Sequence, residues 1–93
     1  MKLSSHKEKR INEKRELCLK KRQAIIEKLG GRDIRSIAPY ETDSFYALYS
    51  ELSRLAGELA PELSGREREE YITLSRLCSA RTDEIIKKKK YTK

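Results

Sequence analysis

The apolar residues between positions 45 and 59 constrain the fold of this chain more than any other feature. They lie three or four residues apart, which is the period of one wide face of an α-helix: Phe45, Leu48, Tyr49, Leu52, Leu55, Ala56 and Leu59. Thr42 or Asp43 can cap the start of this helix, and Pro61 ends it. The sequence therefore predicts a helix over about 44–60 that buries one side.

A second helix is predicted from about Gly65 to Lys88. It opens with Ser64 and Glu67 in the S-x-x-E spacing of a capping box. One face is apolar and carries Tyr71, Leu74, Leu77, Cys78 and Ile85. Because the link over 60–64 is short, the two helices must form an antiparallel hairpin whose facing rows supply most of the core.

The N-terminal stretch predicts a third helix, over about 5–29. Ser5 and Glu8 form another capping box, and Gly30-Gly31 supplies a C-terminal stop. The apolar ladder of this helix recurs every seven residues, at Ile11, Cys18 and Ile25, but arginines at 15 and 22 interrupt the stripe. We therefore expect its second half to dock on the hairpin and its first half to project or to bind a partner.

The connector between the first helix and the hairpin runs from Gly30 to Thr42. Ile34 and Ile37 can pin it to the core, and one helical turn is expected over 33–37. No strand-like alternation occurs in the chain. The predicted fold is all-α, with a long N-terminal basic helix plus an antiparallel helical hairpin, resembling a three-helix bundle.

Charge divides the chain into three parts. Of its 93 residues, 40% are charged and the net charge is +7. Residues 1–31, the basic N-terminal helix, carry +6; residues 32–86, the helical hairpin body, carry −4; residues 87–93, expected to be a flexible lysine-rich tail, carry +5. Basic ends on a mildly acidic body attract polyanions, unless they serve only solubility.

Nucleic-acid phosphates are the polyanion that we expect these ends to bind, without regard to sequence, whether DNA or RNA. The basic residues of the helix come in pairs that spiral around it, and some are offset by acids, as in the i,i+4 pair Glu16–Lys20. The candidate nucleic-acid-binding residues are Lys9, Arg10, Lys14, Arg15, Lys20, Lys21, Arg22, Lys87, Lys88, Lys89 and Lys90.

Catalysis and cofactor binding are not expected. The only histidine is His6, which lies among lysines, and the two cysteines, Cys18 and Cys78, lie on predicted apolar faces as buried thiols. No metal-ligand spacing or nucleotide-binding motif is present, so no cofactor is predicted. No apolar run reaches membrane-spanning length and no secretory signal pattern is visible, so we expect an intracellular protein in the cytoplasm, nucleoid or nucleus.

Aromatic residues concentrate between positions 40 and 71, and most belong to the predicted hairpin core. Tyr40, in the connector, and Tyr46, off the apolar face of its helix, are the exceptions. Because exposed tyrosines are common anchors of protein interfaces, these two are the candidate partner-binding residues.

Residues 34–88 resemble the helical A domain of the GINS family of replication proteins. The matching positions are Pro39, Phe45-Tyr46, the leucines at 48, 52 and 55, Tyr71, Leu74, Leu77, Arg81 and Ile85. The chain departs from the family pattern at Glu84, where a basic residue usually precedes the isoleucine, and it lacks the small β-rich B domain. The resemblance implies a non-enzymatic replisome scaffold that assembles into a tetramer.

Together these features predict a non-enzymatic accessory protein of a nucleic-acid machine. Its helical body would bind a partner protein, and its basic ends would contact the phosphate backbone. The alternative is a structural or assembly subunit, a homo- or hetero-oligomer, in which the basic helix docks into an acidic protein groove and no nucleic acid takes part.

Overall fold

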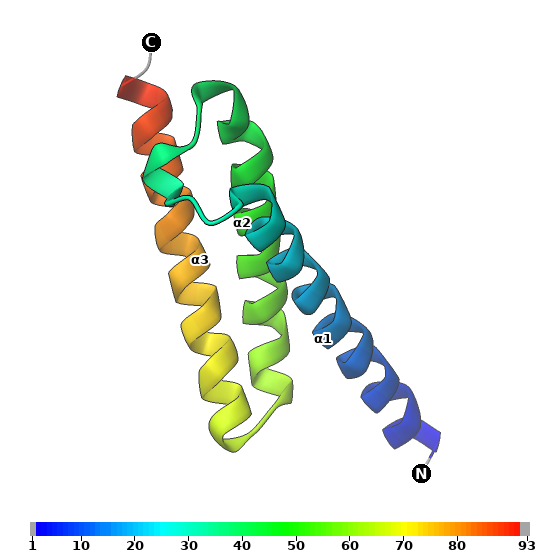
Figure 1. The fold of residues 1–93 in the computed structure, drawn as a ribbon. Helices are drawn as coiled ribbons and strands as arrows, with labels where there is room; N and C mark the ends of the chain where they lie inside the picture. The colour runs from blue at the N-terminus through cyan, green and yellow to red at the C-terminus, as the bar shows by residue number, and fades with distance from the viewer. Residues whose placement is uncertain (1, 92–93) are drawn as a thin grey trace.

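Three long helices pack against one another and confirm the predicted all-α class (Figure 1). The computed structural model describes the backbone of residues 2–91 and the side chains of residues 6–87. The helices are α1 (Lys2–Leu29), α2 (Thr42–Leu59) and α3 (Gly65–Tyr91), and the short 3-10 turns between them are η1 (Ile34–Ser36), η2 (Pro39–Glu41) and η3 (Ala60–Glu62). No strand occurs within residues 2–91.

The predicted hairpin is formed by α2 and α3, which pack antiparallel. At its centre the helices exchange two hydrogen bonds: Ser53 Oγ donates to the Ser75 carbonyl and Ser75 Oγ donates to the Ser53 carbonyl, each at 3.0 Å. Gly57 lies on the same side, where an added Cβ would stand 3.4 Å from Ser75 Oγ. These small residues let the two backbones approach closely.

The core fills the space between the three helices. Its fully buried large side chains come from α1, the connector and both hairpin helices: Cys18, Ile37, Phe45, Leu52, Leu59 and Cys78. Leu52 is buried as predicted, whereas Leu74 is only partly buried. The prediction that Leu77 shares this buried face is wrong, because its side chain is 50% exposed. One residue along a helix is a rotation of about 100°, which turns Leu77 away from its buried neighbour Cys78.

The connector is pinned to the core as predicted. Ile34 and Ile37 are buried, and the Asp33 carboxylate accepts a hydrogen bond from the Arg35 amide to cap the η1 turn. Gly30 follows α1 with a φ of 57°, a left-handed conformation that favours glycine, and so ends the helix where the sequence predicted.

Three helix boundaries differ from the predicted ones. The first helix begins at Lys2, so Ser5 lies inside it and is not its cap; neither glycine nor proline precedes Ser5 to stop the helix. Thr42 does not cap α2 but begins it, and its hydroxyl donates to the Pro39 carbonyl at 2.8 Å. The last helix continues through the lysine run to Tyr91, because lysine is a good helix former.

Candidate partner and nucleic-acid interface

A row of lysines along one edge of α1 faces α2. Its members recur every seven residues, and we call them the lysine ladder: Lys7, Lys14, Lys21 and Lys28. The contacts, in order along α1, are Lys7 to Glu62 at 3.3 Å, Lys14 to Glu58 at 3.8 Å, Lys21 to Glu51 at 3.2 Å, and Lys28 Nζ at 5.7 Å from the centroid of the Phe45 ring. Because α1 runs antiparallel to α2, the partners follow in reverse order. The lysine ladder therefore holds α1 against the hairpin by three ion pairs and one cation–π contact.

Arg15 links α1 to the first turn of α3. Its Nη2 lies 2.7 Å from Glu67 Oε1, and its Nη1 donates to Asn12 Oδ1 at 2.7 Å. The third nitrogen, Nε, is buried and has no hydrogen-bond partner in the structure. An arginine that interrupts the apolar stripe thus joins the interface by pairing with a carboxylate.

The predicted nucleic-acid-binding residues of α1 separate into two groups. Three of them, Lys14, Arg15 and Lys21, are half-buried and paired with hairpin carboxylates. The other four are exposed and form no ion pair within the described residues: Lys9, Arg10, Lys20 and Arg22. The expected i,i+4 pair of Lys20 with Glu16 is not formed. Within the described residues, the ion pairs of α1 are all made to the hairpin and none is made within the helix.

Sequence reasoning missed the ladder. Lys7 and Lys28 were not in the predicted set, which was chosen by adjacent basic pairs rather than by helical phase. The signal was present: the ladder has the same seven-residue spacing as Ile11, Cys18 and Ile25, so both rows keep a constant position on the helix. What the sequence did not reveal was the acidic row opposite.

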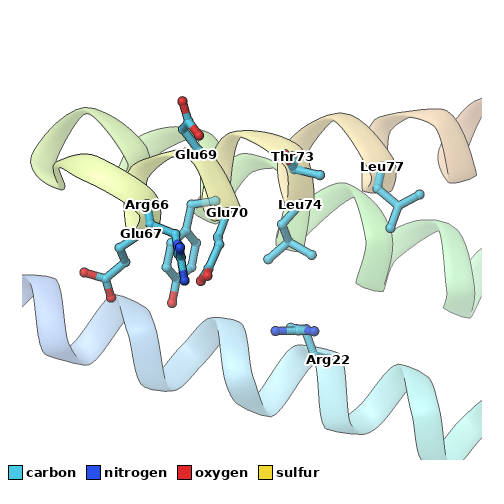
Figure 2. Close-up of a pocket in the computed structure, with 9 residues that line it drawn as sticks. Arg22, Arg66, Glu67, Glu69, Glu70, Thr73, Leu74 and Leu77 are labelled. Carbon is cyan, nitrogen blue, oxygen red and sulfur yellow. The ribbon is translucent and has the colours of Figure 1, made fainter.

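A groove of about 520 Å³ separates α1 from α3 (Figure 2). On the α1 side it is lined by Arg22, and on the α3 side by Glu70, Leu74 and Leu77, whose side chains are directed toward α1 in the close-up. Glu69 points away from α1. The position of Leu77 on the wall of this groove explains its exposure, because α1 does not close over it.

Further apolar side chains lie beside Arg22 on α1. Leu19 and Ile26 are exposed and stand three and four residues from Arg22, which places all three on one helix face. Exposed apolar side chains close to an open groove are a feature of protein-binding surfaces.

The C-terminal end of α3 lies beside the start of α2, at the opposite end of the molecule from the N-terminus (Figure 1). Ser53 and Ser75 lie opposite each other in the antiparallel hairpin. The start of α2, eleven residues before Ser53, is therefore level with the residues about eleven positions after Ser75, which are Ile86 and Lys87. Both predicted partner-binding tyrosines belong to this end: Tyr40 in η2 is 87% exposed and Tyr46 in α2 is 41% exposed. Lys87 is exposed, and the side chains of Lys88, Lys89 and Lys90 lie outside the described residues.

The structure thus brings the two tyrosines and the lysine run of α3 to one end of the bundle. From the sequence alone, the tyrosines and the lysine run are separate features, because they lie in the connector, in α2 and at the end of α3. The two basic ends, by contrast, are held apart along a molecule that is 55 Å long. They do not combine into one surface.

Both cysteines are free and buried, in agreement with the sequence interpretation. Burial raises the pKa of the Cys18 thiol, and it raises that of Cys78 to about 11 against the opposing charge of Arg22. Within the described residues no group of three or more metal-ligating side chains could hold an ion. In the same part of the chain, no helix is apolar over the length that a membrane crossing requires.

Comparison of the chain with known protein families, curated proteins and solved structures finds no match. What is established is a small three-helix protein without a family assignment.

Proposed function

We propose that this protein is a non-enzymatic accessory protein of a nucleic-acid machine, which binds a protein partner through its helical body and phosphates through its basic C-terminal end. The observation that carries the proposal is the meeting of Tyr40, Tyr46 and the lysine run of α3 at one end of the bundle. Exposed aromatic rings at the same end as a lysine run without acidic residues suit both a protein anchor and a backbone contact.

The distribution of charge favours the C-terminal end over α1 for the first phosphate contact. The ladder lysines at 7, 14 and 21 already have carboxylate partners, and so does Arg15. The segment 87–93 holds five lysines and no acid. Cations at a helix C-terminus are also stabilised by the helix dipole. We therefore expect the first phosphate contact at this end, where the segment itself contains no acid.

The phosphate contact is tested with two variants that remove the same charge. Lys87, Lys88, Lys89 and Lys90 are changed to Gln in the first, and Lys9, Arg10, Lys20 and Arg22 in the second. Binding to unrelated DNA and RNA sequences is measured against salt. We expect the first variant to flatten the slope of log affinity against log salt by about 3, since each phosphate contact contributes about 0.7–0.9. The second should change it less. Equal slopes for the parent and the first variant would refute the phosphate contact.

The partner contact is tested with Tyr40→Ala and Tyr46→Ala. Protein captured by the parent from the native host should be lost with these variants while DNA binding keeps its salt slope. Neither tyrosine belongs to the buried core, so both variants should keep the helical circular dichroism signal of the parent. The replication setting rests on the resemblance of residues 34–88 to the GINS A domain, so replisome subunits are the partners expected first.

A second candidate function is an assembly subunit without nucleic acid. The docking of α1 on hairpin carboxylates favours it, since the same basic face fits an acidic protein groove. This candidate predicts no binding to DNA or RNA at any salt concentration, together with a defined oligomer by analytical ultracentrifugation. Salt-dependent binding to unrelated sequences would exclude it.

A further inference from the structure

The first part of α1 is held to the hairpin differently from the rest. We call residues 6–17 the N-terminal arm. Within it no side chain is fully buried, and the only apolar contact with the core comes from the partly buried Ile11. The first buried residue of α1 is Cys18, followed by Ile25. Hydrophobic packing therefore fixes the second half of α1 and hardly reaches the arm.

Ion pairs, rather than apolar packing, hold the N-terminal arm against the hairpin. Three join the arm to the hairpin, from Lys7 to Glu62, from Lys14 to Glu58 and from Arg15 to Glu67. In each of them more than a third of both side chains is exposed. Ion pairs between exposed groups contribute little net stability, and salt screens them. The arm is thus held by contacts that another anion can replace at small cost.

The arm presents the charges that a phosphate backbone would need. Lys7, Lys14 and Arg15 point toward hairpin carboxylates, which occupy the places that phosphate oxygens would take. Arg15 keeps a buried Nε donor without an acceptor, so its present site leaves part of the guanidinium unsatisfied. Arginine and lysine bind phosphate oxygens by the same charge-assisted hydrogen bonds that they make here to carboxylates.

We infer that Lys7, Lys14 and Arg15 form a second phosphate-binding face, covered in the free protein by the hairpin carboxylates and reached by a nucleic acid that exchanges for them. The inference rests on the proposed function, because it requires that nucleic acid is a ligand. The exchange is confined to the arm, since Cys18 and Ile25 keep the second half of α1 docked.

The unmodified protein allows a direct test by zero-length carbodiimide cross-linking, which joins a lysine to a carboxylate only while they touch. The arm gives Lys7–Glu62 and Lys14–Glu58 products, and Lys21–Glu51 in the docked half is an internal control. Saturation with a short mixed-sequence DNA duplex should lower both arm products severalfold and leave the control product unchanged. Unchanged arm products in saturated protein would overturn the inference while leaving the proposed function intact.

Charge-matched variants give a second measurement. The first variant removes the carboxylates that cover the arm, by changing Glu58, Glu62 and Glu67 to Gln. The second variant changes the net charge of the hairpin by the same amount and leaves the arm ion pairs intact. It carries Glu69→Gln, Glu70→Gln and Asp83→Asn. The first variant should bind the duplex about tenfold more tightly than the second, the gain expected from removing three weak competing pairs. Equal affinities would overturn the inference. Failure of the parent and both variants to bind DNA would overturn the proposed function as well.

Discussion

Leu52→Ala tests the helical core at its centre, with Leu77→Ala as the matched control. The Leu52 side chain is 1% exposed in the middle of α2, whereas Leu77 on α3 is 50% exposed. Truncating a buried leucine loses about 0.8 kcal/mol for each buried methylene and leaves a cavity, for a total of about 2–5 kcal/mol. At Leu77 the same truncation should cost about 0.5 kcal/mol, as at other surface positions.

The predicted loss at Leu52 is large for a chain of this size, whose whole stability is about 5–14 kcal/mol at typical values per residue. Urea titrations followed by far-ultraviolet circular dichroism measure both variants against the parent. On heating, followed by the same signal, the melting temperature of Leu52→Ala should fall by at least about 8 °C, from the usual 4–8 °C per kcal/mol in small domains. Equal destabilisation by the two variants would refute the assignment of buried and open helix faces.

Three further predictions follow from the buried thiols, the connector and the end of α1. Cys18 and Cys78 should react slowly with a thiol reagent in the native protein and quickly in urea; rapid native labelling of both would show that their faces are unpacked. The Arg32 guanidinium, 3.0 Å away, lowers the pKa of Glu41 to about 2 from its usual 4.5. Since the folded-state pKa is depressed, this pair stabilises the protein above pH about 4.5, and the stabilisation is lost as the pH falls toward about 2. In urea titrations from pH 4.5 down to pH 2, Arg32→Gln should therefore lose less stability than the parent. Gly30→Ala should cost about 1 kcal/mol by the same assay, because a residue with a Cβ is strained at positive φ.

Local sequence patterns were sufficient to predict the three helices and their order. The three-and-four spacing of 45–59, the short link at 60–64 and the glycine pair after Leu29 each act within a few residues, where period, chain length and backbone freedom decide the outcome. The same holds for the connector, where two isolated isoleucines had no role other than burial. Helix ends were predicted less well, at Ser5, Thr42 and Lys88, since several residues near each end can continue a helix.

Only the tertiary structure decided which charges meet. The sequence showed basic pairs on α1 and acids in the body, but an ion pair such as Lys14–Glu58 depends on the antiparallel register of two helices and on the phase at which each faces the other. It also decided that Tyr40, Tyr46 and the end of α3 share one end of the bundle, and that Leu77 faces an open groove. Apolar period is a property of one helix and can be seen in its residues alone. The pairing of charges and the opening of a groove are properties of two helices, which no local pattern records.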